Sequence, residues 1–186
     1  HHNHRDVGSV VVAVDGVPLL VDAGQPTYTA KTFGPDRYQI RAMQSAWHSV
    51  PAPLGMEQGT GKEFSAEVLQ SPVAGNPRLA LSLGAAYGLP PKSWIRSSSL
   101  DSGSGTITIG DRWELAVPAD DSTGTDKTSN IDITYLTAGT LQLRPEGATV
   151  LPDGIPGVNG GRGAVLRWEP GPVEVLVDEW HLDDPL

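Results

Sequence analysis

The chain has 186 residues, enough for one domain with a substantial core or at most two small ones. Thirteen basic residues stand against 22 acidic ones, a net charge of −9. This balance argues against nucleic acid as a partner, because phosphate binding needs a basic face. The absence of cysteine excludes disulfides and thiolate ligands. The longest apolar run is far shorter than the ~20 residues of a membrane helix, so no membrane span is expected.

The first predicted element is a β-hairpin. Two apolar runs, 10–14 and 17–21, flank Asp15-Gly16, a pair that tolerates positive φ and suits a two-residue type I′ turn. Both runs are apolar at nearly every position rather than alternating. We therefore expect both faces of this hairpin to be covered, as in the middle of a sandwich.

Residues 25–50 leave two interpretations open. Tyr38, Ile40, Met43 and Trp47 fit one stripe of a helix, and they fit a strand with a bulge equally well. The residue pattern does not choose between them.

Short β-branched runs punctuated by 22 glycines and 16 prolines continue through the rest of the chain. They predict strands at 62–70, 79–83, 93–100, 131–136, 140–143 and 149–151. A second hairpin is predicted from 106–109 and 113–117 around Gly110-Asp111, and a closing hairpin from 164–168 and 173–177 around Pro170-Gly171. Polar loops are predicted at 119–130 and 152–163. With no internal repeat and no linker, we predict one all-β domain over 1–186, an antiparallel two-sheet β-sandwich with long polar loops.

Three residues form a nitrogen, oxygen and nitrogen donor set. His4, Asp22 and His48 are of the types that bind zinc, with water in the fourth position. From residue types alone, histidines satisfied by hydrogen bonds in a core are the commoner interpretation.

The text around these residues carries a family resemblance. Residues 2–9 read HNHRDVGS, 20–24 read LVDAG, 27–29 read TYT and 43–48 read MQSAWH. In this order they resemble the C-terminal β-sandwich region of heparinase II/III-like polysaccharide lyases, which typically reads H-N-H-x-D-V-G-S-F, L-V-D-x-G, T-Y-T and M-Q-S-A-Y-H-N. The agreement covers the first fifty or so residues, and a looser similarity continues through 92–96 to the 173–185 tail.

The resemblance implies a site and a reaction. A structural zinc ion would be held by His4, Asp22 and His48, and His2 would face the substrate cleft and act in proton transfer. The reaction is β-elimination at a uronic acid, in which the C5 proton is removed and the glycosidic oxygen at C4 leaves. The remaining catalytic groups belong to a helical toroid domain in cis, so this chain alone is expected to be inactive. Without that domain, the alternative for His2 is a frayed terminal residue.

Four positions depart from the family text. Arg5 stands where asparagine is usual, Val10 where phenylalanine is usual, Trp47 where tyrosine is usual, and Ser49 follows the last histidine in place of asparagine. Arg5 adds positive charge beside the expected cleft, which suits an acidic sugar, and Trp47 keeps an aromatic plane. We therefore assign Arg5 and Trp47 as substrate-binding residues.

One geometric condition follows from the hairpin. A two-residue turn places Ser9 opposite Asp22, so a straight strand would carry His4 roughly 16 Å beyond that pair and onto the other face. The metal site therefore requires the chain before Gly8 to leave the ladder, and glycine permits such a bend.

The functional expectation is the C-terminal domain of a periplasmic or secreted lyase acting on acidic polysaccharide. The parent protein would contain the helical toroid domain, and the present chain would be a module of it. Two alternatives come from other classes: a non-catalytic carbohydrate-binding or structural β-sandwich module, and a plain β-sandwich whose histidines are structural.

Overall fold

Strands dominate the structure, a computed structural model that describes residues 4–115, 131–169 and 173–180. In chain order, the strands are β1 (Val12–Val14), β2 (Val17–Leu20), β3 (Pro51–Pro53), β4 (Glu67–Gln70), β5 (Arg78–Ser82), β6 (Trp94–Asp101), β7 (Thr106–Trp113), β8 (Ile131–Ile133), β9 (Thr140–Arg144), β10 (Gly147–Leu151) and β11 (Ala164–Arg167). Within the described ranges, no helix is long and apolar enough to cross a membrane. The predicted all-β class is confirmed.

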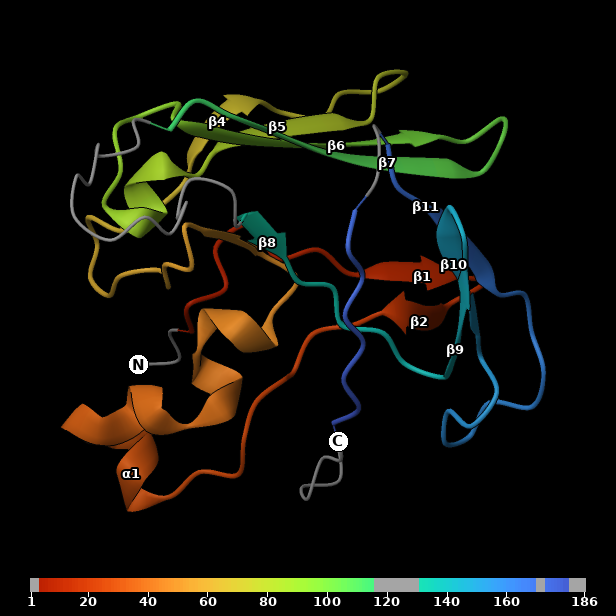
Figure 1. The fold of residues 1–186 in the computed structure, drawn as a ribbon, viewed down its shortest axis with the longest axis horizontal. Coiled ribbons are helices and arrows are strands. Elements are labelled where there is room, and N and C mark those ends of the chain that lie inside the picture. Colours follow the sequence, from red (N-terminus) through yellow and green to blue (C-terminus); the bar gives the residue numbers. More distant parts are fainter. Residues whose placement is uncertain (1–3, 116–130, 170–172, 181–186) are drawn as a thin grey trace.

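The strands pair antiparallel in four small sheets: β1-β2, β3-β8, β11-β10-β9 and β4-β5-β6-β7. In Figure 1 the four-stranded sheet forms one layer along the top, and the orange short helices of residues 30–47 lie at the lower left, away from it. β8 lies between them, and the β1-β2 hairpin lies to the right, next to β9 and β10. The all-β class therefore holds with its strands divided over four sheets, and the two-sheet sandwich stays a prediction.

The first hairpin forms around the predicted turn, over Val12–Val14 and Val17–Leu20 in place of 10–14 and 17–21. The expectation that both of its faces are covered is wrong, because Val11, Ala13 and Pro18 are exposed to solvent. Val14 pairs with Val17 across the turn, and both turn residues have positive φ, 53° at Asp15 and 83° at Gly16. Positive φ at both central positions is the type I′ geometry, which matches the twist of the two strands.

Residues 25–50 form neither one long helix nor a strand. They contain a single-turn α-helix and three 3-10 helices: α1 (Ala30–Phe33), η1 (Pro35–Gln39), η2 (Arg41–Met43) and η3 (Ser45–Trp47). Each short helix ends where the backbone becomes extended, at Gly34, Ile40, Gln44 and His48. This series of turns carries His48 back beside the N-terminal segment.

The predicted hairpin around Gly110-Asp111 is wrong. Both residues lie inside β7, which pairs continuously with β6, and the turn falls instead between Asp101 and Thr106. Asp111 stays in the strand because its carboxylate is buried and paired with Arg96, directly opposite in register. A polar residue that has a buried partner does not need the solvent of a turn.

Two further strand predictions need correction. Only Glu67–Gln70 of the predicted strand 62–70 pairs, because a turn closed by the Phe64 N–H and the Gly61 carbonyl precedes it. In the predicted closing hairpin, 164–167 forms β11 but pairs with β10, while 173–177 lies outside any strand. Its turn, like the predicted loop 119–130, lies outside the described residues. The 152–163 loop carries neither helix nor strand, as predicted.

One cluster of buried hydrophobic side chains includes the start of β6 in the four-stranded sheet, and further buried residues lie on β2 and β10. In this cluster Trp94 is on β6, Ala86 and Tyr87 are on the 3-10 helix η4 (Gly84–Tyr87), and Leu83 directly precedes η4. Residues from the N-terminal segment and from β8 pack on this cluster, among them Val7 and Ile131. The N-terminal segment is thereby fixed against the main sheet.

Candidate metal site

The segment before β1 leaves the ladder, as the geometric condition required. The Ser9 N–H donates to the Asp6 carbonyl at 2.9 Å, and Gly8 has a φ of +87°. The Arg5 N–H donates to the carbonyl of Met43 at 3.2 Å. The turn and this contact bring His4 next to the segment that carries His48.

A buried glutamine reinforces this placement. The Gln58 side chain bonds both backbone groups of Val7, accepting from its N–H and donating to its carbonyl, each at 2.8 Å. The Gln58 N–H donates to the Ser45 hydroxyl at 3.0 Å. Gln58 thus fixes the N-terminal segment, through its side chain, to the turn that precedes His48, through its backbone N–H. No feature of the sequence had singled out Gln58, because its partners are distant in the chain.

Asp22 and His48 are in direct contact. His48 Nδ1 lies 2.8 Å from Asp22 Oδ2, and the Ser9 hydroxyl donates to the same oxygen at 3.2 Å. The other carboxylate oxygen accepts from the Gly24 N–H at 3.0 Å. Burial acts to raise the pKa of Asp22, but its hydrogen bonds with His48, Gly24 and Ser9 outweigh it and hold the pKa below its ordinary value.

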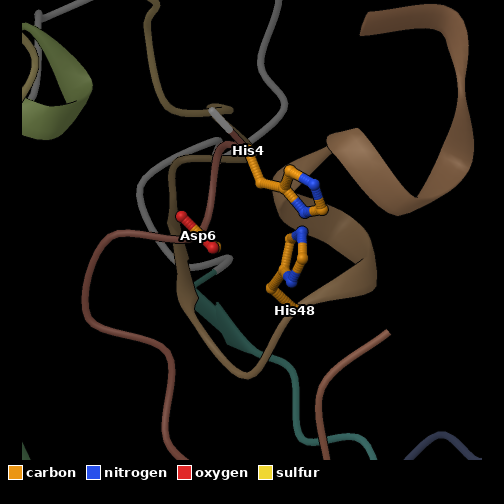
Figure 2. A group of neighbouring side chains, drawn as sticks. All are labelled: His4, Asp6 and His48. Atoms are coloured by element: carbon orange, nitrogen blue, oxygen red, sulfur yellow. The ribbon is translucent and has the colours of Figure 1, made fainter. Parts of the chain in front are cut away.

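His4 faces His48 from the opposite side. The two imidazole rings lie 5.5 Å apart between centroids and are tilted by 47°. Figure 2 shows the rings pointing toward one another, with the Asp6 carboxylate beside them. One ligand atom from each of His4, Asp6 and His48 lies within 4.8 Å of the others, so this group can hold a metal ion.

The chemistry of this group suits a transition metal. Two imidazole nitrogens and one carboxylate oxygen form a donor set typical of zinc and of other first-row divalent ions. Burial lowers the pKa of His4, only partly opposed by the nearby Asp6 carboxylate. A lowered pKa favours the neutral imidazole, which is the form that binds metals.

The predicted residues are only partly assembled into one group. The structure brings His4 to His48 and Asp22 to His48, but the group that can hold an ion contains Asp6 in place of Asp22. His2 lies outside the described residues. The two predicted substrate-binding residues are chain neighbours of the histidines, since Arg5 follows His4 and Trp47 precedes His48.

Arg5 and Trp47 both lie against other side chains. Arg5 pairs with Glu57 at 2.6 Å and lies over the Tyr38 ring, 4.7 Å from its centroid. Trp47 packs against Trp180, with 4.1 Å between ring centroids, and its ring also lies near the Arg41 guanidinium, at 5.2 Å. Arg5 and Trp47, the two predicted substrate-binding residues, are thus each part of an arginine–aromatic contact.

Asp6 was not among the predicted ligands, although the sequence contains a signal for it. His4 and Asp6 are two residues apart, a spacing that places side chains on the same side of an extended segment. The family resemblance implied Asp22 as the carboxylate ligand instead. A scan of the chain against models of protein families gives no match, and a search of curated proteins gives none either. The functional assignment therefore rests on this geometry and on the sequence resemblance.

Proposed function

We propose that the chain is the β-domain of a heparinase II/III-like polysaccharide lyase, carrying zinc and forming one wall of a cleft for uronate-containing polysaccharide. One observation carries the proposal: the segments on which the resemblance rests converge in space. Ser9, Asp22 and His48 are joined by hydrogen bonds, and His4 packs against His48. A resemblance that arose by chance would not require three distant segments to meet at their polar residues.

The proposed reaction divides the catalytic groups between two domains. β-Elimination needs a base for the C5 proton, an acid for the departing C4 oxygen and a positive group that neutralises the sugar carboxylate. His2 is the proposed base, and Arg5 is proposed to contact the carboxylate. The acid would come from the helical domain that the resemblance implies. The chain by itself is therefore expected to bind substrate without turning it over.

The proposed zinc has a structural role. When bound, the ion would link the N-terminal segment to the turn before β3 through His4 and His48, with one carboxylate completing the protein ligands. Holding these segments together positions Arg5, which follows His4 directly, beside the cleft.

A group of arginine and aromatic side chains supports an acidic ligand. Arg5 and Arg37 lie over Tyr38, and Arg41 lies over Trp47. Arg37 is buried, so we call only the other four residues, Arg5, Tyr38, Arg41 and Trp47, the arginine–aromatic surface. Guanidinium groups recognise carboxylates through paired hydrogen bonds, and aromatic faces stack on sugar rings. Arg41 is exposed, whereas the Arg5 charge is paired with Glu57, so a sugar carboxylate would compete with Glu57 for Arg5.

The test is binding of hyaluronan, whose charge comes from uronate carboxylates alone, with neutral dextran as the control polysaccharide. We expect hyaluronan to bind, dextran not to bind, and Arg5→Gln to weaken hyaluronan binding by about tenfold, the loss of one charge-assisted hydrogen bond. Arg78→Gln on β5, an exposed arginine outside this surface, is the matched control.

The alternatives give different results. Absence of hyaluronan binding would contradict the proposal and favour a plain β-protein. Binding that survives chelation of metal would favour the non-catalytic carbohydrate-binding module. Release of unsaturated product, detected by its ultraviolet absorbance, would contradict the division of the catalytic groups between two domains.

A further inference from the structure

The loop between β10 and β11, the blue segment at the lower right of Figure 1, contains the pair Asn159-Gly160. An asparagine carboxamide can react with the backbone nitrogen of the residue that follows it. That nitrogen forms a bond to Cγ, the bond from Cγ to the side-chain nitrogen breaks, and ammonia leaves a five-membered imide. Glycine hinders this attack least, because it has no Cβ atom beside the reacting nitrogen. Water then opens the imide at either of its two carbonyl carbons, which yields aspartate or isoaspartate.

The folded structure leaves both reacting groups of this pair accessible. Asn159 and Gly160 are exposed and lie in neither a helix nor a strand. In the part of the chain that the structure describes, no hydrogen bond engages the Asn159 carboxamide or the Gly160 N–H. A Cβ atom built on Gly160 would meet no atom outside the neighbouring residues within 4 Å, so the space beside the attacking nitrogen is open. The reaction therefore needs rotation within an exposed loop and no unfolding.

Other pairs of this kind in the described ranges are less reactive. Asn76 precedes Pro77, whose backbone nitrogen carries no proton and cannot form the imide. Asp15-Gly16 and Asp153-Gly154 offer a carboxylate, which attracts a nucleophile less than a carboxamide does. In addition, Arg162 binds both oxygens of the Asp15 carboxylate, each at 2.6 Å. The structure thus distinguishes Asn159 from the other candidates.

We propose that Asn159 is a modification site, which deamidates spontaneously in the folded protein through an imide with Gly160. The inference is independent of the proposed function. Each event adds one negative charge to a chain whose net charge is −9. In the isoaspartate product the main chain runs through Cγ and is one carbon atom longer. A stored sample therefore becomes a mixture of charge forms and of two backbone forms.

The test follows the full chain and a synthetic peptide of residues 155–163 during the same incubation at neutral pH. Mass spectrometry of proteolytic fragments locates the change from amide to acid, and labelling by an isoaspartyl methyltransferase identifies isoaspartate. We expect both products at Asn159. The rate in the folded chain should lie within about threefold of the rate in the peptide, because opening of an exposed loop costs almost no free energy. Both rates should rise with pH, since the attacking nitrogen must lose its proton.

One variant and one internal control make the result specific. Asn159→Gln should abolish the modification, because glutamine would have to close a less favourable six-membered ring. Asn76 is the matched control within the same chain, and its amide should stay intact in the same fragments.

Three results would overturn the inference. They are an Asn159 amide that stays intact while the peptide reacts, a folded chain that reacts more than about tenfold slower than the peptide, and equal modification of Asn76. A slow folded chain would mean that the loop has to open before the reaction. None of these results decides whether the chain binds hyaluronan, which is measured separately.

Discussion

Gly8 is the residue that allows the candidate metal site to form. Its φ of +87° turns the chain out of line with β1, and a side chain has no room there. A Cβ atom at this position would lie 2.9 Å from Leu83 Cδ1, which is buried in the core. Positive φ and close approach to a packed side chain are both conditions that glycine meets without strain.

We predict that Gly8→Ala destabilises the protein by about 2 kcal/mol, combining left-handed backbone strain with displacement of Leu83. Urea unfolding measures the loss. Gly105→Ala is the matched control, since Gly105 also has positive φ, +68°, but a Cβ atom added there would meet nothing within 4 Å. The control variant should lose only the smaller part of the unfolding free energy, the part that comes from backbone strain. Equal losses in the two variants would contradict the role assigned to Leu83.

At the scale of elements, η4 is fixed by a buried tyrosine. The Tyr87 hydroxyl donates to the Pro51 carbonyl on β3 and accepts from Gln58 Nε2 at 3.1 Å. The same Gln58 amide donates to Val7 of the N-terminal segment. A helix of four residues has little stability of its own, so these tertiary contacts hold it in place.

Stability above pH 10 should depend on Tyr87. Burial raises the pKa of Tyr87 to about 12, whereas the unfolded chain has the ordinary value of 10.0. The neutral phenol is thus favoured in the folded state, so its contribution is complete below pH 10 and is lost as the pH rises toward 12. The expected slope is about 1.4 kcal/mol per pH unit in this window.

The comparison variant is Tyr87→Phe, which should lose about 1 kcal/mol at pH 7 through the missing hydrogen bonds and should show a flatter fall above pH 10. Tyr28→Phe, at an exposed tyrosine, is the control and should keep the wild-type slope. Chemical denaturation at a series of pH values measures both. An equally steep alkaline fall in Tyr87→Phe would show that other groups cause it.

At the scale of the whole molecule, one buried ion pair joins three distant parts of the chain. Arg96 on β6 and Asp111 on β7 are 2% and 4% exposed and are paired through two hydrogen bonds, at 3.0 and 2.9 Å. Arg96 also donates to the carbonyls of Gly8 and Ser49. Asp111 additionally accepts from the Trp94 indole at 2.7 Å. The pair connects the main sheet to both segments of the candidate metal site.

We predict that Asp111→Ala destabilises the protein by about 3–5 kcal/mol, because it leaves the Arg96 charge buried and uncompensated. Thermal and urea unfolding measure the change. The exposed pair of Asp15 and Arg162 is the control, since its hydrogen bonds are as short, at 2.6 Å, but solvent surrounds it. Arg162→Ala, which leaves the positive-φ turn residue Asp15 in place, should leave stability unchanged within error. A small loss in Asp111→Ala would mean that water reaches Arg96.

Local pattern in the sequence determined the β-class and several individual elements. The type I′ hairpin followed from Asp15-Gly16 between apolar runs, since turn chemistry and its neighbours are adjacent in the chain. The expected register of this hairpin also showed that the chain must bend before Gly8 if His4 is to reach Asp22, because a straight strand would separate the two residues. These conclusions depend on contacts within a few residues.

Only the tertiary structure decided the rest. Gly110-Asp111 has the composition of a turn, yet Arg96 pairs with the aspartate and keeps it inside β7. Asp6 lies beside His48 from some 40 residues away, and Asp22 became a hydrogen-bond partner of His48 from 26 residues away. Local pattern does not encode such placements, because burial and pairing energies arise only once distant segments meet.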